Sequence, residues 1–380
     1  MMNDPIVVTG IGMVTPLGMD RETTWENCIA SRTGIREING KLIPAAGIIP
    51  DLRDRPSSKR AALISLMAAS EALMDSGIHP EQDTHICIGS TVSCSKPPLD
   101  TIIQGCFTHP SDVLQRYFKF TGPVTRYAAA CATGLVSIHA GMRMIQMGLC
   151  DMCLVGSIES SLDDLYCAGF VRLGVIADTS KGHGKAVRPF EQNRSGFLPG
   201  EGGAVMVLEK KSHVLGRQGH MYGEISSCSI GNDAHDPVMF NAGGKCIAEV
   251  IQNALSQAGM STYDDCYINA HGTGTRLNDW LETQAIKQTF GRKAYHIPVS
   301  STKAGTGHLL GAAGSVETAL CLCAIRDQII PPTLNYEIPD PECDLNYTAF
   351  HAQHKTISRA VSLSYGFGGH IGAIVLKKTC

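Results

Sequence analysis

Cys131 is the residue whose setting most clearly predicts chemistry. Small residues precede it, and an apolar helical pattern from Leu135 to Leu149 follows. The sequence therefore predicts a strand, a tight turn and a helix, with the sulfur at the turn. A thiol at a helix N-terminus meets unpaired backbone N–H groups and the positive end of the helix dipole, which favours the nucleophilic thiolate. Most cysteines are ordinary buried residues, so this setting alone separates Cys131 from the rest of the 15 cysteines.

Three loops in the second half of the chain carry the other candidate groups. His271 opens a loop of glycine and threonine, residues 271–275, directly after an apolar strand pattern. Lys303 and His308 lie in a similar loop after the next strand, and residues 366–369 form a glycine loop between the last two strands. Ligands gather at the carboxyl ends of strands in α/β sheets. A single histidine after a strand is usually structural, but two of them with a lysine and a helix-start cysteine predict a catalytic site.

Composition limits the function classes. A chain of 380 residues predicts two domains or two fused halves. With 43% hydrophobic residues and a net charge of -3, it has an ordinary globular composition and no charge that favours nucleic acid. The N-terminus lacks the pattern of a signal peptide, and no apolar run approaches membrane-spanning length, so no membrane association is predicted. The cysteines show no framework spacing, which predicts reduced thiols, a cytoplasmic location and no metal site.

The elements that must position these residues alternate between strand and helix. In the first half we expect a short strand at 6–10, a helix at about 59–75 capped by Ser57 or Ser58, an irregular surface excursion at 93–121 and a poorly periodic region before a strand at 203–209. In the second half we expect strands at 222–230, 267–270, 297–300, 360–364 and 371–376, and helices at about 245–258, 280–290 and 310–325. Alternating buried strands and helices predict an α/β protein. Since the order repeats, we predict two related halves, 1–215 and 216–380.

At this point the motifs resemble a known family. The chain is similar over almost its whole length to the β-ketoacyl-[acyl-carrier-protein] synthases, specifically the elongating condensing enzymes with a Cys-His-His site such as 3-oxoacyl-ACP synthase II. Each motif alone is weak, but six in order are very specific. The motifs are 7–12 with 16–18, 130–134, 188–190 to 201–202, 269–275, 301–303 with 306–314, and 366–369. The resemblance implies a thiolase-like fold, two related α/β halves layered α-β-α-β-α, usually as a dimer.

The resemblance also implies roles for individual residues. Cys131 accepts an acyl group from acyl carrier protein as a thioester, and His271 and His308 promote decarboxylation of a malonyl unit on a second carrier. The amides of Cys131 and Phe367 form the oxyanion hole, and Phe367 gates the site. Thr273 and Thr275 match the threonines that hydrogen-bond the pantetheine arm in the family. Lys303 and Glu317 match a pair of residues that orders the site. The family uses no metal or cofactor of its own, since phosphopantetheine on the carrier holds the substrates.

Departures from the family pattern accompany these matches. The stretch from residue 89 to 127, which helps to form the acyl pocket and the dimer contact in relatives, is shorter here. Leu363 and Tyr365 replace an asparagine and a phenylalanine that are usual beside the gate. These changes predict a specialised synthase of fatty-acid or polyketide type, whose acyl chain length does not follow from the resemblance.

Two other functions stay open at this point. One is a non-condensing partner subunit that shapes chain length in a heterodimer, although such subunits generally lack the cysteine. The other is an acyltransferase or thioesterase that retains acylation and has lost decarboxylation. The leading prediction is a homodimeric condensing enzyme that meets an acidic carrier protein. Lys59 and Arg60, at the start of their helix, are the predicted basic contacts for that carrier.

Overall fold

The computed structural model describes all residues except 1–3, 39–40, 79–84, 91–108 and 380. Ten strands form one mixed sheet in the order β10-β9-β13-β14-β8-β1-β7-β6-β4-β5. The five strands of the first half are β1 (Ile6–Val14), β4 (His85–Gly89), β5 (Val124–Tyr127), β6 (Met152–Glu159) and β7 (Gly202–Lys210). Those of the second half are β8 (Gly223–Asn232), β9 (Tyr267–Asn269), β10 (Val299–Ser300), β13 (Arg359–Gly366) and β14 (His370–Lys377).

The two halves have the same strand topology. In each half the first strand lies beside the last, followed by the fourth, the second and the third strands. The pairings agree as well, because the last strand is antiparallel to both of its neighbours and the remaining strands are parallel. The halves meet where Val7 and Val8 of β1 pair with Glu224 and Gly223 of β8. The duplication predicted from the order of the elements is therefore present in the fold, while the exact boundary at residue 215 stays a prediction.

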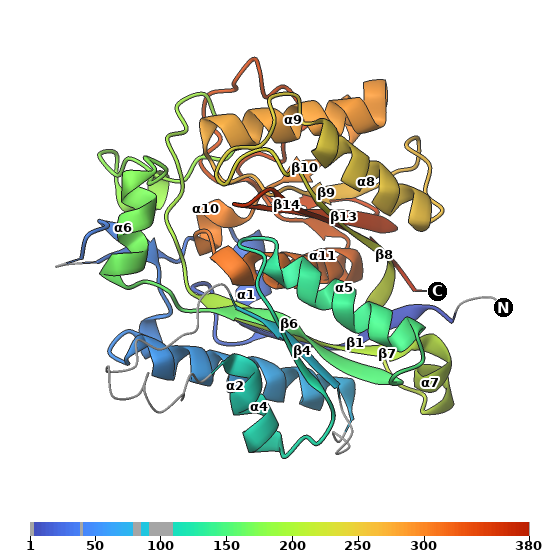
Figure 1. Ribbon diagram of the computed structural model, residues 1–380. Helices are drawn as coiled ribbons and strands as arrows, with labels where there is room; N and C mark the ends of the chain where they lie inside the picture. The colour runs from blue at the N-terminus through green and yellow to red at the C-terminus, as the bar shows by residue number, and fades with distance from the viewer. Residues whose placement is uncertain (1–3, 39–40, 79–84, 91–108, 380) are drawn as a thin grey trace.

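Helices complete five layers (Figure 1). One outer layer covers the strands of the first half, two helices lie between the two halves of the sheet, and the other outer layer covers the strands of the second half. The first outer layer contains α2 (Ser57–Ser76) and α4 (Pro110–Phe118), the middle layer α5 (Thr133–Gln146) and α11 (Ala313–Asp327), and the second outer layer α8 (Lys245–Gln257) and α9 (Arg276–Phe290). This is the α-β-α-β-α arrangement that the sequence resemblance implies.

The middle layer is the most deeply buried part of the molecule. Helix α5 contacts β6 and β8, and α11 contacts β7 and β13, so each helix packs on both halves of the sheet. In α11 every residue from Ala313 to Ile325 is buried. Both helices start beside the candidate site, since α5 begins two residues after Cys131 and α11 begins five residues after His308. Packing of the middle layer therefore positions Cys131 and the loop that carries His308.

The first strand is longer than the sequence pattern predicts. The glycines after residue 9 indicated a turn, but β1 continues through Gly10 and Gly12 to Val14. A Cβ on Gly10 would lie 2.0 Å from the carbonyl oxygen of Ala72 in α2, and one on Gly12 would lie 1.9 Å from that of Ala68. These glycines therefore allow a helix to approach the strand closely, which is why they are found inside it.

Several other expectations for the elements need correction. Helix α2 follows Pro56 at its N-cap position, so neither Ser57 nor Ser58 is the cap. Part of the predicted surface excursion is helical, because Pro110 starts α4 after a capping box at His109, while residues 91–108 lie outside the described residues. The poorly periodic region contains α6 (Asp164–Arg172). Helix α9 starts four residues earlier than predicted, and the last predicted helix begins as a short 3-10 turn, Leu310–Ala312, before α11.

The remaining elements are short. They are α1 (Arg21–Ile29), α7 (Lys211–Gly216), α10 (Lys303–Thr306), the paired strands β2 (Ile35–Glu37) and β3 (Ala45–Gly47), the paired strands β11 (Ile329–Ile330) and β12 (Gln353–His354), and further 3-10 turns at Pro50–Leu52, His183–Lys185 and Gly291–His296. Within the described residues, no helix is long and apolar enough to cross a membrane.

Candidate active site

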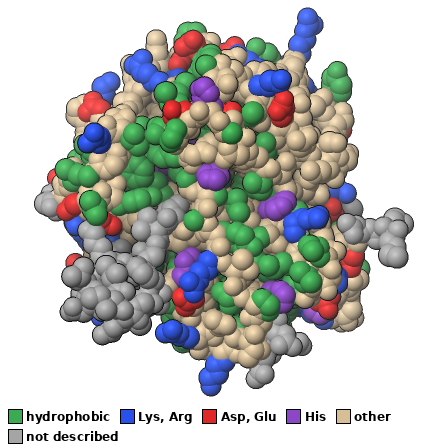
Figure 2. Space-filling view, in the orientation of Figure 1, with side chains coloured by type: hydrophobic (Ala, Val, Ile, Leu, Met, Phe, Trp, Pro, Cys, Tyr) green, Lys and Arg blue, Asp and Glu red, His purple; other side chains and the backbone are tan. Residues whose placement is uncertain are grey.

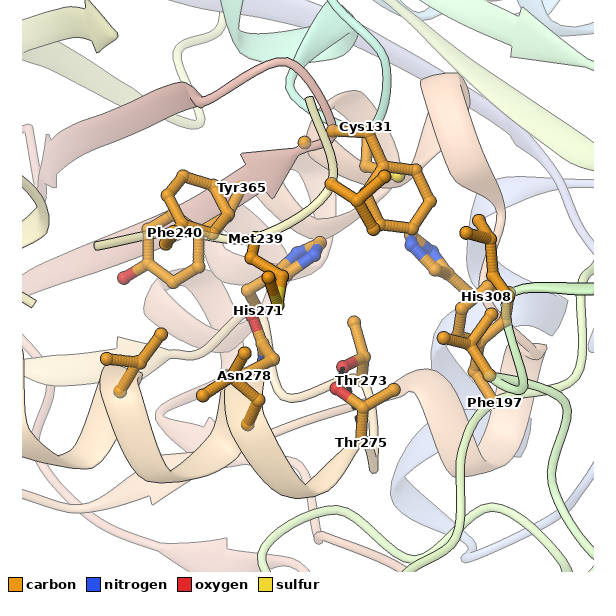
Figure 3. Close-up of a pocket in the computed structure, with 17 residues that line it drawn as sticks. Cys131, Phe197, Met239, Phe240, His271, Thr273, Thr275, Asn278, His308 and Tyr365 are labelled. Carbon is orange, nitrogen blue, oxygen red and sulfur yellow. Dashed lines mark hydrogen bonds between the residues drawn. The ribbon is translucent and has the colours of Figure 1, made fainter. Parts of the chain in front are cut away.

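Cys131, His271 and His308 open on one cavity of about 270 Å³. Figure 3 shows both imidazoles pointing into this cavity, with Cys131 above them. The centroids of the two imidazole rings are 5.3 Å apart, and the rings are almost perpendicular to each other. Each of the three residues lies after a different strand, β5, β9 or β10. The rule that functional loops follow the carboxyl ends of strands therefore predicted their convergence correctly.

The turn that presents Cys131 is locked by Thr133, the first residue of α5. Its hydroxyl donates to the carbonyl oxygen of Ala130 at 2.6 Å and accepts from the amide of Ala129 at 2.7 Å. Ala130 adopts a positive φ of 46°, which gives the chain its sharp change of direction. The sulfur consequently lies at the cavity wall, with only 8% of Cys131 exposed.

Burial changes the expected ionisation of this thiol. The helix N-terminus was predicted to favour the thiolate, but burial raises the pKa of Cys131 to about 12, against the charge of Lys303, which lowers it. The loss of hydration of the sulfur anion outweighs the favourable charge of Lys303. Burial therefore opposes the thiolate that the helix N-terminus was predicted to favour.

A backbone amide fixes the tautomer of His308, and burial favours the neutral form of its ring. The amide of Leu310 donates to its Nδ1 at 3.2 Å, so the ring proton belongs on Nε2. Its pKa lies well below the ordinary value because the ring is buried and Lys303 carries a positive charge nearby. The ring also packs edge-on against Phe197, with centroids 5.0 Å apart. A neutral imidazole with its proton on Nε2 can donate a hydrogen bond to a substrate oxygen.

His271 is positioned through the backbone by a residue that the sequence did not single out. Both carboxylate oxygens of Glu282 in α9 accept amides, one from His271 at 2.7 Å and one from Gly272 at 2.8 Å. The pKa of His271 is also well below its ordinary value, first because of burial and then because of Lys303. Its Nδ1 is buried without a hydrogen-bond partner among the described residues. Glu282 was missed because its role is to accept amides of a loop ten residues away, which its own neighbours in sequence do not indicate.

Lys303 and Glu317 form a buried ion pair behind the cavity. The Nζ atom of Lys303 contacts Oε1 of Glu317, and both side chains are almost completely buried. Burial raises the pKa of Glu317 to about 7, although Lys303 lowers it. Lys303 does not line the cavity, yet its charge lowers the pKa of Cys131, His271 and His308. This position fits a charge that acts on the reactive groups from behind.

The glycine loop between β13 and β14 packs against Cys131. A Cβ on Gly366 would lie 2.8 Å from the amide nitrogen of Cys131, so only glycine allows this approach. The approach brings the next residue, Phe367, onto the cavity wall beside the cysteine. The two segments predicted to form an oxyanion hole are thus adjacent.

Comparison with protein families identifies this arrangement. Residues 3–58 and 51–213 match the model described as beta-ketoacyl synthase, N-terminal domain, and residues 222–337 match the beta-ketoacyl synthase, C-terminal domain. The chain is a member of the β-ketoacyl synthase family. As a synthase of fatty-acid or polyketide biosynthesis it is an acyltransferase, and its five layers are those of the thiolase-like fold.

Similar proteins come from both pathways. The synthase is 34% identical to the tetracenomycin polyketide synthase ketoacyl synthase alpha subunit of Streptomyces glaucescens, over 98% of this chain and 97% of that one. It is 32% identical to 3-oxoacyl-[acyl-carrier-protein] synthase 2 of Staphylococcus aureus, over 99% of both chains. A type II polyketide ketosynthase solved in complex with its acyl-carrier protein has a TM-score of 0.93 at 27% identity, and the ishigamide ketosynthase/chain length factor has 0.89 at 27%, each over 100% of both chains.

The wall of the synthase cavity combines polar and apolar side chains. The hydroxyls of Thr273 and Thr275 are 3.0 Å apart and lie on the cavity wall with Asn278. The two threonines are therefore where the resemblance implies contact with the pantetheine arm. The apolar wall includes the segment from Val238 to Phe240, which the sequence analysis did not single out because it lies outside every motif. This wall consists of Leu173, Val175, Phe197, Val238, Met239, Phe240, Leu277 and Leu281.

The two departures from the family pattern have different positions. Leu363 is fully buried in the apolar core of the second half and is not part of the cavity wall. Tyr365 does line the cavity, with its ring centroid 5.3 Å from that of His271. Burial, followed by the nearby Glu282, raises the pKa of its phenol well above the ordinary value. Of the two changes, only Tyr365 alters the surface that a substrate meets.

Arg60, one of the two basic residues predicted to contact the carrier, forms an ion pair within the protein. The Nε atom of Arg60 lies 2.7 Å from Oε2 of the fully buried Glu201. Arg60, in the first turn of α2, therefore pairs with a buried carboxylate. Lys59 beside it is exposed and stays a candidate for carrier binding.

Proposed function

We propose that this synthase is an active elongating enzyme that forms an acyl thioester on Cys131 and condenses it with a malonyl unit carried by acyl carrier protein. The observation that carries the proposal is the convergence of Cys131, His271 and His308 on one cavity from three separate strand ends. A non-condensing subunit would not need a thiol at this position. An acyltransferase or thioesterase alone would not need two histidines beside it.

The neutral imidazoles supply the chemistry of the second half-reaction. When the bond between the malonyl C2 and its carboxylate breaks, carbon dioxide leaves and the electron pair moves onto the thioester oxygen as an enolate. Ring N–H groups of His271 and His308 stabilise that charge by hydrogen bonding. The carbanion then attacks the acyl carbonyl on Cys131, and the cysteine leaves as a thiolate. The low pKa of both imidazoles supports this role, since they donate without first being protonated.

The neighbouring groups fit the remaining requirements of the reaction. The amides of Cys131 and Phe367 are proposed to hold the acyl carbonyl oxygen, which the close approach of Gly366 supports. Phe367, which lines the cavity together with Cys131, is proposed as the gate. Thr273 and Thr275 are proposed to bind the amides of the pantetheine arm, which carries both substrates so that no further cofactor is required.

The synthase is proposed to be a cytoplasmic dimer that meets acyl carrier protein. The described cysteines are free thiols, as expected in a reducing compartment. Strand β5 ends the sheet and pairs only with β4 among the described strands, so its other edge can accept a partner. A homodimer is the first proposal. A heterodimer with a related chain is the second, because a solved relative is a ketosynthase/chain length factor pair. The cavity-lining Tyr365 supports a specialised member of the family.

Intact mass measurement tests the proposal. The purified synthase is mixed with acyl carriers of graded chain length and then with malonyl carrier, beside a Cys131→Ala control. We expect an acyl adduct that requires Cys131 and disappears as a β-ketoacyl carrier forms. An acyl adduct that is released to water without decarboxylation would replace the proposal with a thioesterase. No adduct, with wild-type decarboxylation of malonyl carrier also absent, would refute it.

A further inference from the structure

Four sulfur atoms lie together at the end of α5 that is farther from Cys131. The Sγ atom of Cys153 in β6 is 3.7 Å from that of Cys87 in β4, which is 3.5 Å from the Sδ atom of Met144 in α5. Cys150 packs against the same part of the core, and the thiol of Cys153 donates a hydrogen bond to its sulfur. These four residues do not line the catalytic cavity, so the proposed condensation does not use them.

Cys150 is the member of this sulfur cluster that solvent can reach. Cys87 and Cys153 are completely buried, whereas Cys150 is half-buried. It follows the last turn of α5, where Met147 is 66% exposed and Leu149 is 58% exposed. Figure 2 shows hydrophobic and basic side chains close together on the right of the molecule, over this end of α5 in Figure 1. A small oxidant can therefore meet Cys150 while the other two thiols stay enclosed.

The neighbours of Cys150 favour its reactive form. The hydrogen bond from Cys153 lowers the pKa of Cys150, and the charge of Lys210 adds to this effect against burial and Asp151. Cys246 is also half-buried, but burial raises its pKa. The thiolate is the form of cysteine that peroxides oxidise, and a second thiol in contact with it can complete a disulfide.

We propose that Cys150 and Cys153 form an oxidation site that reacts with peroxides and closes to a disulfide while Cys131 stays reduced. In the first step the sulfur of Cys150 bonds to one oxygen of hydrogen peroxide, the O–O bond breaks, and the other oxygen leaves as hydroxide and is protonated to water. In the second step the sulfur of Cys153 attacks that of Cys150, the S–O bond breaks, and the hydroxyl leaves as water with the proton of Cys153. The two thiols are oxidised by two electrons, which reduce the peroxide to water.

The catalytic cysteine differs from Cys150 in both respects that govern oxidation. Only 8% of Cys131 is exposed, and burial opposes its thiolate. Peroxide should therefore oxidise Cys150 before Cys131. The inference concerns thiol chemistry alone and does not depend on condensation, so a synthase that failed to condense would leave it intact.

Peptide mapping after treatment with an equimolar amount of hydrogen peroxide tests the inference. The remaining thiols are alkylated, and the synthase is cleaved without reduction by a protease that cuts before aspartate. Because this cut falls between Cys150 and Asp151, a disulfide from Cys150 to Cys153 joins two separate peptides. We expect free thiol to be lost equally at Cys150 and Cys153, and recovered with dithiothreitol, while Cys131 and Cys246 are alkylated in full.

Two variants separate the steps. In Cys153→Ala the second thiol is missing, so dimedone should capture a sulfenic acid at Cys150 in much greater yield than in wild type. In Cys150→Ala the thiol of Cys153 should stay reduced at the same dose, because it is completely buried. Oxidation of Cys131 or Cys246 ahead of Cys150 would overturn the inference. So would a disulfide that joins Cys153 to Cys87, or oxidation of Cys150 in wild type to a sulfinic acid with no disulfide.

Discussion

The ionisation of Cys131 offers a direct test of how burial and the helix N-terminus compete. An ordinary cysteine has a pKa of about 8.5, so about one thiol in four is ionised at pH 8. With a pKa of about 12, only about one Cys131 in 10,000 is ionised at that pH. A more basic thiolate is also more nucleophilic. Its rate constant is therefore higher by a factor of roughly 25–55, which offsets part of the loss from the smaller ionised fraction. We therefore expect Cys131 to react with a small neutral disulfide about 40- to 100-fold more slowly than an ordinary thiol does.

The assay follows modification of Cys131 by peptide mass spectrometry between pH 7 and pH 10. Its reference is the same cysteine in the urea-unfolded chain. In the folded synthase the rate should rise about tenfold per pH unit across the whole range, because the pH stays below the pKa. In the unfolded chain the rate should level off above about pH 8.5. The pH dependence separates ionisation from steric access, which would slow the reaction equally at every pH. A folded-state rate that levels off below pH 9 would refute the reasoning and show that the helix N-terminus prevails.

Two further predictions concern stability. Lys303→Met should lower the free energy of unfolding in urea by about 3–5 kcal/mol, because it leaves Glu317 buried and unpaired. Lys303→Met combined with Glu317→Leu should restore much of that loss, and a double variant less stable than the single one would contradict this account. Gly12→Ala should cost at least about 1–3 kcal/mol, since its Cβ would lie 1.9 Å from the oxygen of Ala68 and α2 must move. Its control is Gly169→Ala in α6, where the Cβ meets nothing within 4 Å and stability should stay equal or rise by up to about 1 kcal/mol.

The positions of the reactive residues followed from local sequence. His271 and His308 each come after an apolar strand in a loop of small residues, and such loops share one edge of a sheet. The thiol of Cys131 was placed correctly at a strand-to-helix turn for the same reason. Its burial was not predicted, because burial depends on Phe170, Phe197 and Leu310, which come from distant parts of the chain. Pattern reasoning locates a group but does not show what surrounds it.

Glycine was the most ambiguous residue to interpret. Gly10 and Gly12 suggested the end of a strand, yet they continue it because α2 packs against them. Helix α6 was missed because only two of its residues are buried, so it has no long apolar face for periodicity to detect. Glu282 shows a similar limit, since its role comes from accepting two amides of another loop and not from its own neighbours in sequence.

The complete burial of α11 bears on how independent the two halves are. A helix with no solvent-facing residue from Ala313 to Ile325 cannot be stable in a fragment that lacks one of the sheets around it. The same holds for α5, which packs on strands of both halves. Although the strand order records a duplication, we expect neither half to fold on its own. The synthase should unfold in one cooperative transition, and its nucleophile and histidines should be assembled and lost together.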